Sequence, residues 1–537
     1  MPMDVPELLR RLDPLPGSPE ELRRFADLQR QLQSRFQRFT DDVTVPYTAV
    51  VIPSQSFDPR ELAKIDGVAH YEERSLFNLM LMRHPRLRVV FVTSKRIDPL
   101  IVDYYLHQMR GVPPAHARRR LLLLDCDDAT PRPLTEKILE RPRLLRRIKD
   151  AIDDPEMAHL VHFNSTPLER TLAVQLGIPM NATDPLLSYL GTKSGCRKAF
   201  ARAGIPVAEG REDLRDEHDV AEALAEVWEA RPHTRRMVVK LDDSFSGEGN
   251  ALLDLAPLHE VAPGGRASSA QRAAALEAAL PSLRFEAKGL GWEEYRTQLR
   301  GMGGVCEAWI EGEGKRSPSV QLRINPAHEV QAISTHDQVL GGPSGQIFQG
   351  ATFPADPSYR LEIQALGEQV GQVLADDGVI GRFAVDFLVV PASEPGTPPR
   401  ITAVEINLRQ GGTTHCFNTL RFITDGRYER ETGRFLTRLG HERAYFATDT
   451  IQQPRYRGLL PFDLIDLLVV NGIHVGADDT GVVFHLLGCL SQYGKLGCTA
   501  ISHTPEQARA LYERTLGLLD ALANDPVGTT PLVAPIR

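Results

Sequence analysis

Two neighbouring β runs constrain this chain more than any other feature of its 537 residues. They are GRFAVDFLVV (381–390) and RITAVEIN (400–407), and a turn-rich PASEPGTPP segment joins them. Asp386 interrupts the first run, while Glu405 and Asn407 stand two residues apart in the second and so share one face of that strand. If the runs pair, two carboxylates and an amide oxygen converge, and such hard oxygen ligands hold Mg²⁺ on nucleotide phosphates. The sequence therefore predicts a magnesium site here.

The residues after the second run extend this group. Arg409 continues the same i, i+2 face and could neutralise a developing oxyanion. Gly411 and Gly412 follow it and allow backbone N–H groups to approach a substrate. Glu405 taken alone could be a strand residue that faces solvent, but the whole group at this spacing is much less expected by chance. We therefore predict that Arg409, Gly411 and Gly412 take part in catalysis.

A second segment, MVVKLDDSFSGEGNALLDL (237–255), places a lysine at the end of a strand. Lys240 would supply a fixed positive charge, and a loop with Ser246, Gly247 and Gly249 would let backbone N–H groups approach phosphate oxygens. A plain glycine-rich turn is the alternative. The loop does not match G-x-x-x-x-G-K-[ST], so the pattern excludes a P-loop.

A third segment, VCEAWIEGEGKRSPSVQLRIN (305–325), predicts two strands around an acidic turn. Its backbone around Ala308 and Ile310 could hydrogen-bond adenine, and Glu313 could reach ribose hydroxyls, although a charged hairpin tip explains the same residues. A fourth segment is the helix around Lys193, which taken alone is an ordinary surface lysine.

Elsewhere β runs alternate with helical stretches. A polar helical lead-in is expected up to about residue 42, followed by a parallel α/β unit up to roughly residue 180. The predicted strands of this unit cover 44–53, 86–94, 119–126 and 159–166, and its predicted helices cover 70–83 and 98–110.

The rest of the chain predicts three further units. The second begins near Thr183 with a helix over 184–203, which Gly204 and Pro206 end. Its strands are expected at 236–241, 250–255, 304–310 and 318–323, with an insert at 256–298 that carries a surface helix. The third unit, from about residue 326, would hold strands at 328–334, 381–390 and 400–407. The last piece, 456–523, predicts the strands LIDLLVVNG, TGVVFHLLG and KLGCTAIS and then a helix.

Charge and hydropathy reduce the classes of binding partner to be expected. The net charge is −8 and no dense Lys/Arg face is visible, so neither nucleic acid nor an anionic membrane surface is the expected partner. The longest apolar stretches fall far short of the ~20 residues that span a bilayer. The six cysteines are scattered without a C-x-x-C pair, which favours free thiols in a reducing cytoplasm. We expect a cytoplasmic protein that acts on small molecules, with a homodimer as the base-rate assembly.

Taken in this order, the four segments resemble the ATP-grasp superfamily over about residues 160–420. More narrowly, HDQVLGGPSGQIFQGATFPA (336–355) and GVVFHLLGCLSQYGKLGCTAIS (481–502) are similar to the pheganomycin-type peptide ligases. The superfamily pattern matches Lys193 with Gly204-Ile205-Pro206, Lys240 with its loop, Glu307-Ala308-Trp309-Ile310, Asp386, and Glu405-Ile406-Asn407-Leu408-Arg409.

The resemblance implies a multidomain fold of α/β and α+β units. These are an N-terminal pre-ATP-grasp α/β domain (1–180), a two-lobed ATP-grasp fold, a small C-terminal α+β domain (451–525) and a loose tail (526–537). The two lobes are a small nucleotide-binding subdomain (181–325) and a large subdomain with the metal site (326–450). The long insert at 256–298 leaves the boundary of the small subdomain open.

The resemblance also implies a reaction that uses ATP with Mg²⁺ or Mn²⁺. A carboxylate attacks the γ-phosphate to give an acyl phosphate, and an amine then attacks that carbonyl to form an amide. Implied nucleotide ligands are Lys193, Lys240, Ser246, Gly247, Gly249, Glu307, Ile310 and Glu313; implied metal ligands are Asp386, Glu405 and Asn407. An ATP-dependent carboxylase and a non-catalytic nucleotide-binding protein are the alternatives.

Several polar residues are left outside the predicted machinery. His415 could touch substrate, whereas His485 is expected to be a hydrogen-bonded structural histidine. Tyr493 and Lys495 are expected in a turn. Four further residues could line the large-domain side of the cleft, although a loop of satisfied polar groups is the expected interpretation: His336, Asp337, Gln338 and Gln349.

Overall fold

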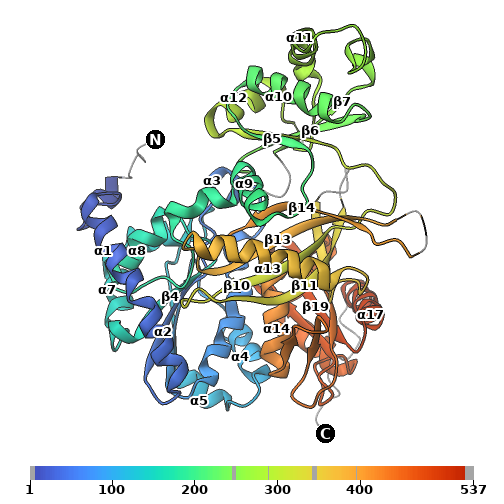
Figure 1. The fold of residues 1–537 in the computed structure, drawn as a ribbon. Helices are drawn as coiled ribbons and strands as arrows, with labels where there is room; N and C mark the ends of the chain where they lie inside the picture. Colours follow the sequence, from blue (N-terminus) through green and yellow to red (C-terminus); the bar gives the residue numbers. More distant parts are fainter. Residues whose placement is uncertain are drawn as a thin grey trace.

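Three larger sheets and one two-stranded sheet organise the part of the chain described by the computed structural model (Figure 1). The described residues are 7–244, 249–287, 289–341, 347–392, 394 and 396–525. The predicted loose tail (526–537) lies outside them. No helix among them is long and apolar enough to cross a membrane.

The N-terminal sheet is parallel, in the order β3-β2-β1-β4, as the alternation of strands and helices predicted. Helices on both faces bury its strands, which explains their continuous apolar runs. The predicted helix at 70–83 is a 3₁₀ helix, η2 (Val68–Arg83), and that at 98–110 is α4 (Pro99–Gln108). The strands are β1 (Tyr47–Ile52), β2 (Leu87–Thr93), β3 (Leu121–Asp125) and β4 (Ala158–His162).

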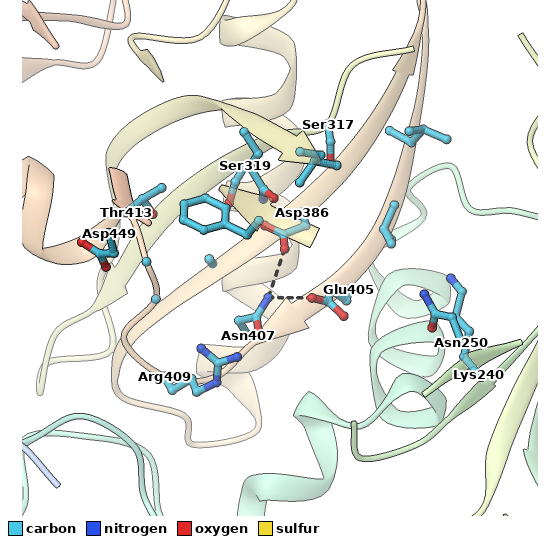
Figure 2. Close-up of a pocket in the computed structure, with 18 of the residues that line it drawn as sticks. Lys240, Asn250, Ser317, Ser319, Asp386, Glu405, Asn407, Arg409, Thr413 and Asp449 are labelled. Atoms are coloured by element: carbon cyan, nitrogen blue, oxygen red, sulfur yellow. Dashed lines mark hydrogen bonds between the residues drawn. The ribbon is translucent and has the colours of Figure 1, made fainter. Parts of the chain in front are cut away.

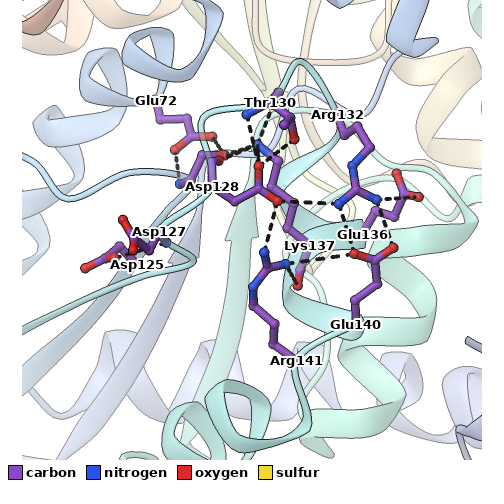
Figure 3. Close-up of polar contacts among 11 residues, drawn as sticks. Glu72, Asp125, Asp127, Asp128, Thr130, Arg132, Glu136, Lys137, Glu140 and Arg141 are labelled. Carbon is purple, nitrogen blue, oxygen red and sulfur yellow. Dashed lines mark hydrogen bonds and ion pairs between the residues drawn. The ribbon is translucent and has the colours of Figure 1, made fainter. Parts of the chain in front are cut away.

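A buried polar network fills the carboxyl ends of β2 and β3 (Figure 3). Lys137 is 1% exposed, and its ammonium donates to Ser94 Oγ (3.0 Å) and to the carbonyls of Asp128 (2.8 Å) and Thr130 (2.7 Å). Glu72 accepts from the backbone N–H and the hydroxyl of Ser94, both at 2.6 Å. Ligands of open parallel sheets bind where strand connections change direction, here between β1 and β4, whereas this network lies at β2 and β3.

The second sheet is antiparallel and projects from the rest of the molecule at the top of Figure 1. Its order is β5-β9-β6-β7-β8. The insert at 256–298 contributes to its core, because α11 (Ser269–Ala279) and α12 (Trp292–Met302) bury Leu276 and Tyr295 there. The Tyr295 hydroxyl donates to the carbonyl of Val239 (3.0 Å). The strands are β5 (Gly210–Leu214), β6 (Arg236–Leu241), β7 (Asn250–Asp254), β8 (Arg284–Phe285) and β9 (Gly304–Ala308).

The third sheet has eight strands in the order β14-β13-β10-β11-β12-β17-β19-β18. The strand expected at 318–323 belongs to this sheet as β10, so the sheet crosses the predicted boundary at residue 325. The strands predicted for a separate C-terminal domain extend the same sheet. Its strands are β10 (Pro318–Ile324), β11 (Val330–Gly341), β12 (Ile347–Phe353), β13 (Gly381–Val390), β14 (Arg400–Asn407), β17 (Ala444–Gln452), β18 (Gly481–His485) and β19 (Lys495–Ser502).

One predicted strand, LIDLLVVNG, is wrong. The segment forms α15 (Pro461–Val470), with Pro461 in its first turn and the Asp463 carboxylate accepting from the N–H of Leu460 (2.8 Å). Leu464, Leu467 and Leu468 are buried, so the apolar run has helical spacing and only one of its faces meets the core.

Helices position the sheet residues that matter for the site. The predicted helix at 184–203 is split into the 3₁₀ helix η4 (Pro185–Gly191) and α9 (Lys193–Ala203). Thr192 caps α9 by accepting from the N–H of Gly195 (3.0 Å), and Gly204 ends it with φ of 68°. With α13 (Arg360–Asp376), α9 packs on the eight-stranded sheet, which places Lys193 beside β14.

Candidate active site

A cavity of about 930 Å³ lies where the two antiparallel sheets meet the loops that follow β1 and β4. Figure 2 shows Lys240 facing Glu405 from the small sheet, with Asp449 on the opposite side of the view. The cavity lining includes Lys193, Lys240, Glu307, Ile310, Asp386, Glu405, Asn407, Arg409, Gly411 and Gly412.

The carboxylate pair predicted from the sequence is formed by cross-strand neighbours. Strands β13 and β14 are antiparallel, and Asp386 is directly opposite Glu405. The Asn407 amide donates from Nδ2 to Asp386 Oδ2 (3.2 Å) and to Glu405 Oε1 (3.1 Å) (Figure 2). On its other side Asp386 is directly opposite Ser319 of β10. The three predicted metal ligands therefore converge at one point.

The two carboxylates differ in their electrostatic surroundings. Burial raises the pKa of Asp386, and the nearby Glu405 carboxylate raises it further. Burial would also raise the pKa of Glu405, but the Lys193 ammonium outweighs it and holds that pKa below its ordinary value. Lys193 Nζ lies 2.5 Å from Glu405 Oε2. The site thus holds one firmly ionised carboxylate and one that retains a proton more readily.

The predicted catalytic segment follows β14 into the cavity. Arg409 is over the ring of Phe57, 5.8 Å from its centroid, and burial lowers the pKa of Arg409 while Glu405 and Asp386 partly offset this effect. The Gly411 N–H donates to Thr414 Oγ1 (2.9 Å), so this donor is already engaged. A Cβ at Gly412 would lie 2.9 Å from the Phe348 ring, so this glycine permits a close approach.

Lys240 lies in a buried charge cluster with two other side chains. Its Nζ is 2.6 Å from Glu307 Oε2, and Arg197 Nη1 is 2.8 Å from Glu307 Oε1. Burial would raise the pKa of Glu307, but Lys240 and Arg197 together keep it below its ordinary value. Glu307, which the resemblance assigned to the nucleotide, thus pairs directly with a predicted phosphate ligand.

The predicted adenine hinge forms an apolar wall of the cavity. Ala308 and Ile310 line it together with Val238 and Leu388. The Ala308 N–H is engaged with the carbonyl of Glu209 (2.8 Å), so it is not available to adenine. The carbonyl of Ile310 accepts from Lys315 Nζ (3.1 Å).

Some predicted nucleotide ligands are not brought into the cavity. Glu313 is exposed at the turn after β9 and is not among the described residues that line the cavity. Gly249 packs against Ser244, where a Cβ would lie only 2.4 Å from that side chain. Ser246 and Gly247 lie outside the described residues.

The far end of the cavity holds residues that sequence reasoning missed. Arg74 of η2 pairs with Asp449 of β17 at 2.7 Å, and Lys495 begins β19 instead of sitting in a turn. His415 Nε2 lies 3.1 Å from the Asp449 carboxylate, which can only accept, and 3.2 Å from His485 Nε2, behind this wall; His415 does not line the cavity. No motif joins residues 375 positions apart in the chain, so only the fold could reveal this group.

Comparisons with known proteins found two matching family models and two curated relatives. A family model described as IQCH-like, ATP-grasp matches residues 185–278 and 283–431, and one described as PGM1 C-terminal domain matches residues 463–515. The chain is 31% identical over 470 residues to L-propargylglycine–L-glutamate ligase of Streptantibioticus cattleyicolor, with 86% of this chain and 92% of that protein covered. It is 22% identical over 450 residues to IQ motif-containing protein H of Danio rerio, covering 77% of this chain and 42% of that protein.

Solved structures share the fold. A biotin carboxylase of Campylobacter jejuni aligns with a TM-score of 0.51 at 13% identity, over 90% of this chain and 96% of that one. The biotin carboxylase domain of a Hydrogenobacter thermophilus 2-oxoglutarate carboxylase aligns with a TM-score of 0.50 at 13% identity, over 89% and 94%. At this identity the likeness concerns the arrangement of the elements alone.

Proposed function

This chain belongs to the ATP-grasp superfamily, among the pheganomycin-type peptide ligases, and from that premise we propose that it uses ATP to join a carboxylate to an amine. The relative of known activity is a ligase of two amino acids, which supports an amino acid or short peptide for each substrate. A role in specialised metabolism, in a reducing cytoplasm, fits that relative and the six free, buried thiols. A homodimer stays a prediction.

The observation that carries the proposal is the meeting of opposite charges across one cavity. The eight-stranded sheet supplies Asp386, Glu405 and Asn407, while Lys193 and Lys240 reach the same space from α9 and β6. Phosphoryl transfer needs mainly positioning and charge neutralisation, and this arrangement offers cations for phosphates beside oxygen ligands for a metal.

The oxygen ligands fit Mg²⁺ or Mn²⁺ by their chemistry. Asn407 Nδ2 hydrogen-bonds both carboxylates, which marks the place where a positive group is favoured between them. Asn407 would have to turn its amide to present Oδ1 to an ion. Held by Asp386, Glu405 and Asn407, Mg²⁺ would offset the negative charge of the ATP phosphates.

The two lysines can exchange their glutamates for phosphate oxygens at little cost. When Lys240 turns to a phosphate, Glu307 keeps Arg197 and is not left as an unpaired buried charge. When Lys193 does so, Glu405 is released toward the metal position. The ion pairs thus hold the phosphate ligands in place before ATP binds.

In the proposed reaction the substrates supply both nucleophiles. A carboxylate oxygen attacks the γ-phosphorus, and ADP leaves with the electrons of the broken P–O bond. The amine nitrogen then attacks the acyl phosphate carbon, phosphate leaves, and the nitrogen gives up a proton. Arg409, buried beside Glu405, would stabilise the oxyanion that develops on the carbonyl.

The test is phosphate release from ATP and Mg²⁺ with amino acids and dipeptides offered in pairs, and mass spectrometry of the products. Release that requires both partners, with an amide product, supports the proposal. Release with bicarbonate in place of the acid would instead support a carboxylase. ATP binding without release for any pair would contradict ligation of these substrate classes.

A further inference from the structure

A buried lysine at the far end of the cavity takes no part in the reaction proposed above. Lys495 is 8% exposed and lines the cavity, and its Nζ lies 3.5 Å from the carbonyl oxygen of Asp66. It is also 4.9 Å from the centroid of the Tyr71 ring. Within the described residues, no carboxylate oxygen lies within 4.0 Å of this ammonium. An uncompensated buried charge is costly, so its retention calls for an anion.

A second cation, Arg74, lies beside Lys495. Arg74 lies over the same Tyr71 ring, 4.4 Å from its centroid, so two cations flank one phenol. Asp449 is the carboxylate partner of Arg74 at 2.7 Å and compensates one of these two cations. Burial lowers the pKa of His415, which backs Asp449, so this histidine stays neutral. We call Tyr71, Arg74, Asp449 and Lys495 the Lys495 subsite.

The Asp66 carboxylate also lines the cavity, and its Oδ2 accepts from Gln452 Nε2 at 3.0 Å. It forms no ion pair with Lys495, whose ammonium contacts the backbone carbonyl of Asp66 instead. The Lys495 subsite therefore offers a ligand in the cavity an ammonium without a contacting carboxylate, beside a phenol. The predicted phosphate ligands Lys193 and Lys240 lie on other elements, so a substrate carboxylate is the anion that suits Lys495.

We propose that the Lys495 subsite binds a substrate carboxylate that the enzyme does not activate. This proposal rests on the proposed function and narrows its substrate class. At least one substrate is an amino acid or peptide with a carboxylate that stays free in the product. That carboxylate belongs either to the amine donor or, as a second carboxylate, to the acid donor. The subsite joins η2 of the N-terminal region to β17 and β19, which gives the C-terminal strands a part in substrate selection.

The experiment compares acids with their amides in wild type and Lys495→Met. Amine donors are L-alanine, L-leucine and L-glutamate against their α-carboxamides; acid donors are L-glutamate against L-isoglutamine, whose α-carboxylate is blocked. Wild type should prefer the free α-carboxylate by about 10- to 100-fold in kcat/KM, as charged hydrogen bonds allow, and the variant should lose that preference. If the preference is lost for the amine donors, the bound carboxylate belongs to the amine donor; if it is lost for the acid donors, it belongs to the acid donor.

The controls separate a binding role from a structural one. Lys198→Met removes an exposed lysine that pairs with Asp213 and should keep the preference intact. Activity of Lys495→Met on the carboxamides should stay within about three-fold of wild type, which a general structural defect would not allow. A variant that retains the wild-type preference overturns the proposal.

A binding measurement keeps this inference independent of turnover. Calorimetric titration of L-alanine, L-leucine and L-glutamate into protein with ADP and Mg²⁺ should show at least 10-fold weaker binding to Lys495→Met for the probe that binds. Equal binding to both proteins, or no binding of any probe to wild type, overturns the subsite. Absence of ATP turnover by wild type would instead count against the proposed ligation.

Discussion

The two ends of the eight-stranded sheet differ in how their polar residues are assembled. At the β13–β14 end, Asp386, Glu405 and Asn407 come from two consecutive strands. At the β17–β19 end, Asp449 and Lys495 meet Arg74, which comes from a 3₁₀ helix near the N-terminus. The first end is a local hairpin motif, while the second exists only because distant parts of the chain pack together.

The ends also differ in charge. Acidic groups dominate the first end, and Lys193 of α9 and Lys240 of β6 lie beside them, as suits a metal ion and phosphates. At the second end the Lys495 ammonium forms no ion pair within the described residues, as suits a ligand carboxylate. The difference suggests that one sheet separates the transfer of phosphate from the choice of substrate.

The largest expected effect is at the first end. Glu405→Gln should reduce ADP formation about 1000-fold or more, because loss of a metal ligand removes several kcal/mol of transition-state stabilisation. Phosphate release measured with the active substrate pair tests this. Glu513→Gln, which changes an exposed glutamate on α17 (Pro505–Ala523), is the matched control and should behave as wild type. Wild-type turnover by Glu405→Gln would overturn the metal assignment.

A somewhat smaller loss is expected at the lysine that faces this end. Lys240→Ala should lower kcat/KM for ATP about 100-fold or more, since a fixed charge on a phosphate is removed. Arg197 still pairs with Glu307, so the protein should remain folded by circular dichroism. An unchanged kcat/KM for ATP would show that Lys240 is a structural ion-pair residue.

At the second end, two substitutions should change stability in opposite directions. Asp449→Asn should lower the free energy of unfolding by about 3 kcal/mol, because it leaves Arg74 buried without its carboxylate. Lys495→Met removes a buried charge that lacks a carboxylate partner among the described residues and should leave stability unchanged or raise it. Urea denaturation measures both. Equal destabilisation by the two would contradict the charge assignment at this end.

The smallest effect concerns the strand between the two ends. His336 of β11 is buried against the Tyr445 hydroxyl at 2.6 Å, and burial lowers the pKa of His336 to about 3. Below about pH 6.5 this histidine therefore takes up a proton in the unfolded chain but stays neutral in the folded protein. The free energy of unfolding falls as the pH drops below about 6.5. At pH 5 the titration of this histidine should lower the free energy of unfolding by about 2 kcal/mol.

His336→Gln isolates this titration. The substitution can change the free energy of unfolding at pH 8 by any amount. The further loss between pH 8 and pH 5 should be smaller than in wild type by about 2 kcal/mol. Thermal and urea unfolding at the two pH values give the comparison. A pH dependence identical to wild type would show that His336 is protonated in the folded protein or not at all in this range.

Local patterns predicted much of this molecule. The strands of the parallel sheet and the cross-strand pair of Asp386 and Glu405 follow from apolar runs and from the two-residue period of a strand. The prediction failed at LIDLLVVNG, where a short apolar run fits a strand or a buried helix and only packing decides. Exposure is also beyond local patterns: Glu313, predicted near ribose, is exposed and outside the cavity lining, and its role stays a prediction.

The sequence by itself determined that Asp386, Glu405 and Asn407 would meet, because they lie on adjacent strands whose geometry is local. Only the tertiary structure decided which strands share a sheet, since pairing of β10 with β13 depends on long-range contacts. It likewise decided that Lys495 would be buried beside Tyr71 and Arg74. Burial is a property of the packed chain, and it is burial that turns an ordinary lysine into a charge in need of a ligand.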